Sequence, residues 1–529
     1  MKYSGLRTND IRLPDVVKRA LAATLLLLLL SSVITSALGN TLSSGNTDEI
    51  DKIIKQAAKL TRGGNLVDAE NLLRHAVEID PARADAKVEL AYVLVKQRRL
   101  TEAYDIVFAV ADADRQNARA FAVLGMTLLA GGHFNEARAI LYTSVKLNRK
   151  EDLAWAGFGM LEFYENHIDQ SLNNLREAVF FNPREPDYLF ALAQVSARAE
   201  KYQEAAENYD RFLRESILSD TDRRARIKGL INFLKYLGQK EGLYLPAGND
   251  QTKIHFDLVG NRPVIKLKIN GRHEPLKFVL DTGSGISVIS EDVAKRLRIG
   301  SITKGGYAKG IGGDGRFEIV YGFLREVNIG EVNVRNVPIY IRKFQNENQD
   351  VDGYVGLSLI SKFLTTIDYG DQSFTLTRRE VDAREFRENN SLSMPLRLTS
   401  SGFLSGEVQL EGVEVPLNFI VDTGASVSVI SNRVAGLKTI SQFVNEEKLR
   451  VIGSAGVTGD VPTFLLPRVT FGTHSRKRII AVALDLDIIN EASGFEQAGI
   501  LGGNFLKNYR LTFDFKSAKV TFTPLTPEN

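Results

Sequence analysis

Hydrophobic and polar positions along the chain follow two different periods, and the change falls near residue 239. From about Asp51 to Leu237, apolar residues recur at the three-to-four-residue spacing of amphipathic helices. Beyond this point apolar and polar residues alternate, as in VIKLKI (264–269) and KVTFTP (519–524), which predicts β-strands. We therefore expect a helical first half and an all-β second half.

Small residues in the helical half recur every 34 residues. Segments 65–81 and 167–183 also match each other along their length. Small side chains allow two helices to cross closely, and stacked helix pairs bury a continuous core. Five such units are visible, and Arg223–Leu237 is expected to form a closing helix. The small residues form two sets, Ala57, Ala91, Gly125, Gly159 and Ala193, and Ala69, Ala103, Ala137, Ser171 and Ala205.

The β half contains an internal duplication. Residues 275–290 read PLKFVLDTGSGISVIS and residues 416–431 read PLNFIVDTGASVSVIS, with ten of sixteen positions identical. Each copy ends an apolar strand with Asp-Thr-Gly, and a glycine-rich segment and an apolar-apolar-Gly segment follow. If the two loops face each other, Asp281 and Asp422 meet as a carboxylate pair, which is suited to activating water against an amide.

Composition and charge exclude several classes of function. The length of 529 residues suggests about three domains. A net charge of +3, without a long basic tract after the first twenty residues, argues against nucleic acid as a partner. The absence of cysteine excludes disulfides, thiolate metal sites and a cysteine nucleophile. The six histidines are scattered, so we expect no metal and no cofactor.

The N-terminal segment has the pattern of a targeting signal. A basic stretch precedes an apolar run with six consecutive leucines, and small residues follow at Ala37-Leu38-Gly39. This pattern predicts a signal peptide, and an uncleaved membrane anchor is the alternative. An exported protein without cysteine suits the bacterial periplasm, either free or anchored to the inner membrane and facing the periplasm.

Both halves resemble known families. The helical half is similar to tetratricopeptide repeats. The β half resembles the aspartic protease family, as a tandem retropepsin/pepsin-like unit of bacterial type. The resemblance rests on FVLDTGS and FIVDTGA, each paired with a downstream motif, Tyr354-Val355-Gly356 or Ile500-Leu501-Gly502. In that family the downstream motif packs beneath the aspartate loop.

The fold class that follows is multidomain. We expect an all-α tetratricopeptide-repeat solenoid followed by an all-β, double acid-protease-like unit of two pseudo-symmetric halves. The predicted boundaries are 1–39 for the signal peptide or anchor, 50–238 for the repeats, 239–253 for a linker, 254–377 for half 1, 378–392 for a second linker and 393–526 for half 2.

The resemblance assigns roles within the two loops. Asp281 and Asp422 are the expected catalytic residues. The threonines that follow them would cross-link the loops by hydrogen bonds, and the glycines would bring backbone N–H groups close to the carboxylates. Ser284 is able to donate to Asp281, whereas Ala425 has no such group. The expected supporting residues are Thr282, Gly283, Ser284, Thr423, Gly424 and Ala425.

The glycine-rich hairpins between the motifs are expected to form flaps that close over the site and exclude water. Ordinary hairpin turns are the alternative. The flap candidates are Ile311, Gly312, Gly313, Ile452 and Gly453.

The leading hypothesis is an exported aspartic endopeptidase that acts on peptides or proteins, with the repeats docking substrate or a protein partner. One alternative is a catalytically silent peptide-binding module of the same fold. Another is an assembly scaffold in which the repeats carry the function. We expect the two loops of one chain to pair with each other, and pairing between two chains is the alternative.

Overall fold

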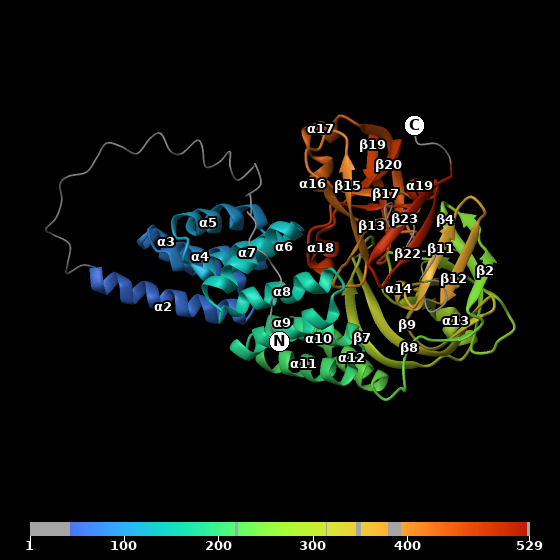
Figure 1. Cartoon of the computed structure of the whole chain (residues 1–529), viewed down its shortest axis with the longest axis horizontal. Helices are drawn as coiled ribbons and strands as arrows, with labels where there is room; N and C mark the ends of the chain where they lie inside the picture. The colour runs from blue at the N-terminus through green and yellow to red at the C-terminus, as the bar shows by residue number, and fades with distance from the viewer. Residues whose placement is uncertain (1–42, 217–220, 314, 345–350, 379–392, 526–529) are drawn as a thin grey trace, which may run out of the picture. The chain divides into compact units, whose positions relative to one another are not determined.

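The predicted targeting segment (1–39) and nearly all of the second predicted linker lie outside the part of the chain that the structure describes. No helix of the described part is long and apolar enough to cross a membrane. Lys52–Asn529 form one compact unit. The residues that the computed structural model describes are 43–216, 221–313, 315–344, 351–378 and 393–525 (Figure 1).

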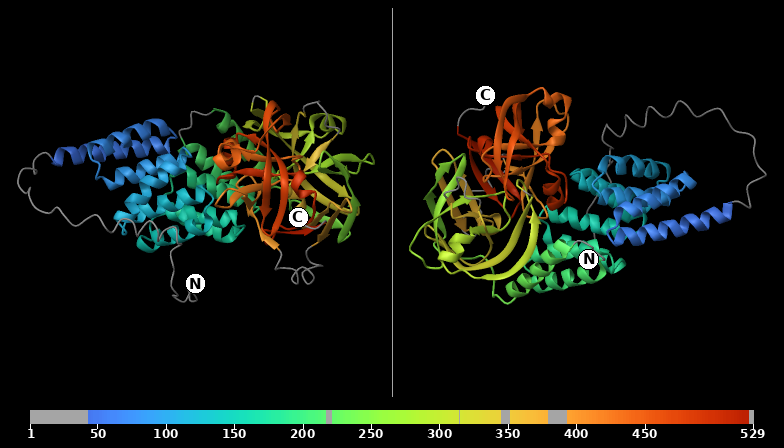
Figure 2. Two further views of the ribbon diagram at one scale, coloured as in Figure 1. Left: turned by 90° about the horizontal axis from the view of Figure 1, so that it is seen from above. Right: turned by 180° about the vertical axis from the view of Figure 1, so that it is seen from behind.

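The helical part consists of consecutive antiparallel helix pairs and a final helix, α12 (Figure 2). This confirms the five predicted repeats and the closing helix. The helices are α2 (Ser43–Arg62), α3 (Leu66–Ile79), α4 (Ala84–Lys96), α5 (Leu100–Ala113), α6 (Ala118–Ala130), α7 (Phe134–Leu147), α8 (Asp152–Tyr164), α9 (Ile168–Phe181), α10 (Pro186–Arg198), α11 (Tyr202–Glu215) and α12 (Thr221–Leu237).

The periodic small residues lie where helices cross. A β-carbon added to Gly125 would lie 2.6 Å from a methyl carbon of Leu141, and one added to Gly159 would lie 2.4 Å from Leu175. The Ser171 hydroxyl donates to the Gly159 carbonyl at 2.6 Å. Larger side chains would push the helices apart, which explains the period in the sequence.

The turn after the first helix of each pair repeats with the same period. In every case one residue takes a left-handed backbone conformation, with φ between 60° and 81°. Glycine and asparagine adopt this conformation easily, whereas Arg98 and Glu200 adopt it at a steric cost. The residues are Gly64, Arg98, Gly132, Asn166 and Glu200.

The β part contains three sheets. Half 1 (residues 245–378) and half 2 (residues 393–525) each build one sheet with the same central pattern, and the third sheet joins them. The half 1 sheet has the order β1-β9-β6-β10-β5-β4-β8-β7, with β3 beside β4. Its strands are β1 (Leu245–Gly248), β3 (Asp257–Val259), β4 (Arg262–Ile269), β5 (Leu276–Leu280), β6 (Ser287–Ser290), β7 (Ser301–Lys309), β8 (Arg316–Ile329), β9 (Val332–Arg342) and β10 (Gly353–Val355).

The half 2 sheet repeats this arrangement in the order β14-β15-β16-β21-β17-β20-β19-β18. Its strands are β14 (Arg397–Leu398), β15 (Leu404–Leu410), β16 (Leu417–Val421), β17 (Ser428–Ser431), β18 (Val444–Ile452), β19 (Val457–Phe471), β20 (His474–Leu484) and β21 (Gly499–Leu501). Short helices α13 (Glu291–Arg296), α14 (Leu357–Ile360), α16 (Asn432–Ala435), α17 (Lys438–Ser441), α18 (Asp487–Ser493) and α19 (Gly503–Leu506) connect strands in both halves.

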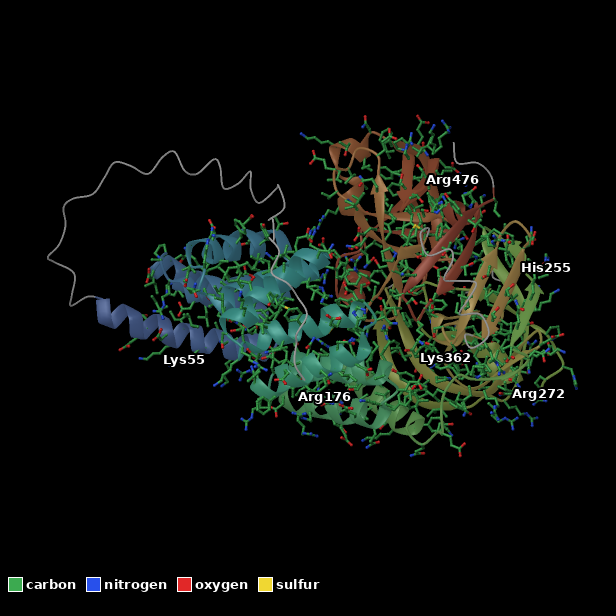
Figure 3. The ribbon with its side chains drawn as sticks, in the orientation of Figure 1. Lys55, Arg176, His255, Arg272, Lys362 and Arg476 are labelled. Carbon is green, nitrogen blue, oxygen red and sulfur yellow. The ribbon has the colours of Figure 1, made fainter. Side chains whose placement is uncertain are left out.

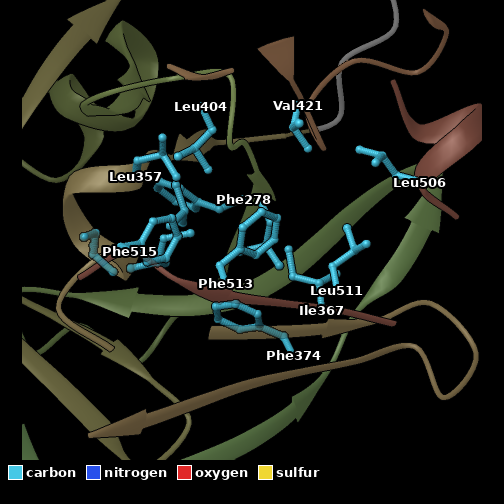
Figure 4. Close-up of a cluster of buried hydrophobic side chains, with 14 of the residues drawn as sticks. Phe278, Leu357, Ile367, Phe374, Leu404, Val421, Leu506, Leu511, Phe513 and Phe515 are labelled. Carbon is cyan, nitrogen blue, oxygen red and sulfur yellow. The ribbon is translucent and has the colours of Figure 1, made fainter. Parts of the chain in front are cut away.

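The third sheet takes strands from both halves in the order β13-β23-β22-β11-β12-β2. At its centre β11 of half 1 pairs antiparallel with β22 of half 2. Figure 4 shows the apolar side chains of both halves that form one continuous core beside it. Because the halves share a sheet and a core, they fold as one body. The strands are β2 (Gln251–His255), β11 (Phe363–Asp368), β12 (Ser373–Arg378), β13 (Ser393–Pro395), β22 (Tyr509–Asp514) and β23 (Lys519–Pro524).

The prediction of a linker over 239–253 is wrong. This segment contains β1, which pairs with β9, and most of β2, which pairs with β12. Its glycines, proline and asparagine are typical of loops and obscured the strand pattern. Such residues are tolerated here because both strands are short and lie at sheet edges. Half 1 therefore begins near Leu245 rather than at Ile254.

The helical and β parts share a core. Phe495 of half 2 is fully buried between Phe134 and Tyr164 of the repeats, with ring centroids 4.9 Å from each. The backbone N–H of Glu496 donates to the Ala130 carbonyl at 2.9 Å. The repeats are therefore not an independent domain on a flexible tether.

Half 1 is held to the repeats as well. Phe233 of α12 stacks on Tyr321 of β8, with centroids 4.5 Å apart. Lys362, labelled in Figure 3, forms an ion pair with Glu200 at the end of α10. Arg226 donates to the Tyr307 carbonyl of β7 at 2.9 Å. The final helix thus packs along β7 of the β7–β8 hairpin.

Candidate active site

The two aspartates end equivalent strands. Asp281 follows β5 and Asp422 follows β16. The backbone N–H of Asp281 donates to the Val355 carbonyl, and that of Asp422 donates to the Leu501 carbonyl, each at 3.0 Å. The apolar-apolar-Gly segments therefore lie parallel to the strands and fix both aspartates, as the sequence led us to expect.

The threonines cross-link the two loops within one chain, as predicted. The Thr282 hydroxyl donates to the Val421 carbonyl, and the Thr423 hydroxyl donates to the Leu280 carbonyl, each at 2.7 Å. Each hydroxyl also accepts from the backbone N–H of the other threonine, at 3.0 and 3.2 Å. Both threonines are fully buried, so this pseudo-symmetric network sets the distance between the loops.

The glycines after the threonines allow the carboxyls to meet. Gly283 N–H donates to Asp281 at 3.0 Å, and Gly424 N–H donates to Asp422 at 2.7 Å. A β-carbon on Gly283 would lie 2.4 Å from Asp422 Cγ, and one on Gly424 would lie 2.6 Å from Asp281 Oδ1. Any larger residue at either position would drive the loops apart.

Asp281 and Asp422 lie close together, because each carboxyl occupies the space beside the glycine of the other loop. Burial, and next the charge of Asp422, raise the pKa of Asp281 well above its ordinary value. Burial also raises the pKa of Asp422, against the opposing effect of the Gly424 N–H. Two carboxyls in contact resist double ionisation, so the pair holds one proton between them over an extended pH range.

The expected donation from Ser284 to Asp281 is wrong. The Ser284 hydroxyl donates instead to the Ile286 carbonyl at 2.9 Å. The backbone carbonyl of Ser284 accepts from Leu357 N–H, and that of Ala425 accepts from Gly503 N–H, at 2.8 and 2.7 Å. The two positions therefore serve the same backbone role, and the difference between their side chains does not act on the aspartates directly.

The two glycine-rich hairpins that contain the flap candidates meet each other. Ala455 N–H donates to the Ile311 carbonyl at 2.8 Å, and Gly313 N–H donates to the Val457 carbonyl at 3.2 Å. Gly312 has φ of +88°, and a β-carbon there would lie 2.2 Å from the Gly456 carbonyl. The tips of β7–β8 and β18–β19 thus touch each other.

Sequence reasoning overlooked two serines that support the site. Ser287 Oγ accepts from Gly356 N–H, and Ser428 Oγ accepts from Gly502 N–H, each at 3.1 Å. Both serines are buried, and both stand six positions after the aspartate of their copy. Their identity in the two copies was the signal available in the sequence.

Glu162, Glu165 and His167 are grouped closely enough to suggest a metal site in the repeats. Arg138 already occupies this cluster, at 2.7 Å from Glu162 and 2.5 Å from Glu165. The guanidinium supplies the positive charge that the acids require, so the cluster gives no reason to expect an ion.

Comparisons with known families agree with this architecture. Residues 265–359 and 406–505 match the family model described as aspartyl protease. Residues 60–126 and 156–219 match two models described as tetratricopeptide repeat. The segments matched to the protease model contain Asp281 and Asp422. No curated protein matches the chain.

Several solved structures align with part of the chain. PilF of Pseudomonas aeruginosa is 21% identical, over 37% of this chain and 89% of its own, with a TM-score of 0.27. TTC0263, a thermophilic TPR protein of Thermus thermophilus, is 18% identical, over 34% of this chain and 98% of its own, with a TM-score of 0.30. YrrB, a TPR protein with an unusual peptide-binding site, is 23% identical, over 36% of this chain and 97% of its own, with a TM-score of 0.22.

Proposed function

We propose that this protein, which carries aspartyl protease family domains at residues 265–359 and 406–505 and tetratricopeptide repeats before them, is an endopeptidase. The observation that carries the proposal is the close pair of Asp281 and Asp422, held by two loops of one chain that buried threonines cross-link. Such a pair provides a base and an acid at one point, which amide hydrolysis requires.

In the proposed reaction the dyad holds one proton. The ionised carboxyl takes a proton from a water molecule, whose oxygen attacks the carbonyl carbon of the substrate. The protonated carboxyl donates a hydrogen bond to the substrate carbonyl oxygen. As the C–N bond breaks, a proton passes to the leaving nitrogen, and the dyad returns to its singly protonated form.

The direct test is the cleavage of a denatured protein by the purified full chain. A statine-type inhibitor, whose hydroxyl imitates the tetrahedral intermediate, should stop the cleavage. Peptide binding without turnover would favour the silent binding module. Normal cellular function of a variant lacking both aspartates would favour the scaffold.

Activity should fall as the pH rises through the second ionisation of the dyad, because a doubly ionised pair has no proton to donate. Stability should change in the same direction. The folded dyad binds its proton more tightly than the unfolded chain, in which the pKa of aspartate is about 3.9. The bound proton therefore adds to the free energy of unfolding. This added stability is fully present below that pH, and it is lost as the pH rises toward the raised pKa of Asp281.

Urea unfolding across this pH interval provides the measurement. The loss of stability with rising pH should be smaller in Asp281→Asn, which has no proton to lose at that position. Equal pH slopes for the two proteins would contradict the raised pKa.

Gly453→Ala should lower kcat/KM by about 10²-fold, the effect expected when a closing element is displaced by about 1 Å. The added β-carbon would lie 2.3 Å from the Ile311 carbonyl of the other flap, so the tips would have to separate. Gly459→Ala is the matched control, because a β-carbon at this exposed glycine meets no atom within 4 Å. Equal peptidase kinetics for the two variants would argue against closure by these tips.

We also propose that the repeats bind a protein, substrate or partner, and that the chain is exported. Tetratricopeptide repeats imply protein–protein interaction in general. Between α4 and α10, however, Lys96 forms an ion pair with Asp187 at 2.7 Å, and Lys96 is largely buried. A ligand between these helices would have to displace that pair. Detection of the protein in a periplasmic fraction would support export.

A further inference from the structure

The surroundings of the dyad differ between the two halves, and the strand register allows equivalent positions to be compared. In half 1, β6 pairs with β9 so that Ser290 lies opposite Arg342. In half 2, β17 pairs with β20 so that Ser431 lies opposite Leu484. Ser290 and Ser431 are equivalent residues of the duplication. Arg342 therefore occupies the position in half 1 that Leu484 occupies in half 2.

Two further positions differ in the same way. Val279 of half 1 corresponds to Ile420 of half 2, and their neighbours on one side are Tyr354 and Ile500. On the other side the neighbours are Val264 and Ser405. Two residues earlier along these strands stand Arg262 in half 1 and Phe403 in half 2. The half 1 positions are thus Arg262, Arg342 and Tyr354, and the half 2 positions are Phe403, Leu484 and Ile500.

The half 1 side is cationic and adjoins the dyad. The Arg342 guanidinium lies 4.0 Å from the ring centroid of Phe317 in β8 and donates to the Ser454 carbonyl of the opposite flap. The Arg262 Nε–H donates to the Val259 carbonyl at 3.5 Å. Continuing the antiparallel register of β4 and β5 by two residues past Val264 and Val279 places Arg262 opposite Asp281. Within the described ranges, neither arginine forms an ion pair with a carboxylate of the protein.

The environment of Arg342 makes a carboxylate ligand favourable. Burial lowers the pKa of Arg342, because the guanidinium has lost part of its water. A cation that has already lost water forms stronger hydrogen bonds with an anion than a fully solvated one does. A ligand carboxylate that binds on this side therefore contacts a guanidinium that folding has already partly desolvated.

The half 2 positions Phe403, Leu484 and Ile500 are all apolar. Leu484 and Ile500 are buried in a cluster with Ile420, and Phe403 is partly buried against it. Ala425 of the aspartate loop and Ile311 of the opposite flap pack on the same cluster. A bulky apolar side chain of a ligand would extend this cluster and lose water on doing so.

We infer that the site around the dyad selects peptides with an acidic side chain on the half 1 side and a bulky apolar side chain on the half 2 side. Cleavage of such peptides rests on the proposed function, whereas their selection rests only on the residues that surround the dyad. Arg262 and Arg342 are specificity-determining residues in this assignment, and they take no part in activating water.

Two measurements on the full chain test the inference. In the first, the Asp422→Asn protein captures peptides from a random library, and the bound peptides are sequenced. In the second, the active protein digests a denatured proteome, and the residues around each cut are tabulated. We expect enrichment of Asp or Glu on one side and of Leu, Ile, Val or Phe on the other.

Arg262→Phe and Arg342→Leu replace each arginine with the residue found at the equivalent half 2 position. For a peptide pair differing only in Glu or Gln at the enriched position, each variant should lose about tenfold of the preference for Glu, as expected for a hydrogen bond to a charged group. Arg272→Leu, at an exposed residue labelled in Figure 3, is the control and should keep the preference. If Arg342→Leu fails to fold, the partly exposed Arg262 still provides the comparison.

The outcomes separate the two claims. Cleavage or binding without an acidic preference, or with a preference unchanged in Arg262→Phe, overturns the inference and leaves the proposed function standing. A protein that cleaves nothing but binds acidic peptides overturns the proposed function alone. A protein that neither binds nor cleaves peptides overturns both.

Discussion

Replacing Asp422 with asparagine lowers the rate of peptide cleavage by roughly 10³- to 10⁴-fold, because the dyad loses the group that shares its single proton. The asparagine side chain can still donate or accept a hydrogen bond, but it cannot carry the charge that takes a proton from water. Asp281→Asn should cost about as much, and the double variant little more, because the two carboxyls act as one unit. The measurement is turnover of a cleaved peptide at saturating and at limiting concentration.

The matched control is Asp485→Asn, the same chemical change at an exposed acid near the end of β20. The asparagine keeps the oxygen that accepts from Asp487 N–H at 2.8 Å, so the local fold should survive. Its activity should equal that of the wild type. If Asp422→Asn instead cleaves peptides as fast as this control, the dyad is not the catalytic centre.

Phe495→Ala should lower the free energy of unfolding by about 3–5 kcal/mol, the usual cost of removing a buried phenylalanine. The ring fills a space between Phe134 and Tyr164, so its loss leaves a cavity between the repeats and half 2. Trp155 in α8 is the single tryptophan of the chain, and its fluorescence reports on the repeats. The substitution lies in the β part, yet the Trp155 transition should move to lower urea concentration.

Phe180→Ala is the control, because this ring is 76% exposed and its loss opens no cavity. That variant should change the stability by no more than about 0.5 kcal/mol. If the urea concentration of the Trp155 transition is the same in Phe495→Ala as in the wild type, the two parts unfold independently. The shared core also implies that deletion of the repeats would uncover Phe495, so point variants are the sounder way to separate the roles of the two parts.

The agreement between sequence and structure is closest where a pattern is repeated. The 34-residue period requires small residues at helix crossings, and the structure has Gly125 and Gly159 in contact with leucines there. The duplicated Asp-Thr-Gly loops carry the threonines that cross-link them. The disagreements lie at a single side-chain hydrogen bond and at two short edge strands, neither of which follows a repeated pattern. The Ser284 hydroxyl turns to Ile286, and the supposed linker pairs with β9 and β12.

The amino-acid sequence by itself determined the order of the repeats, the two acidic loops and their supporting glycines, because these follow from local propensity and from the duplication. Only the tertiary structure decided that the hairpin tips touch, that Phe495 enters the repeats, and that Arg342 of half 1 donates to Ser454 of half 2. The physical reason is that these features arise from contacts between residues far apart in the chain. Such contacts depend on shape and on loss of water, which no local pattern of residues records.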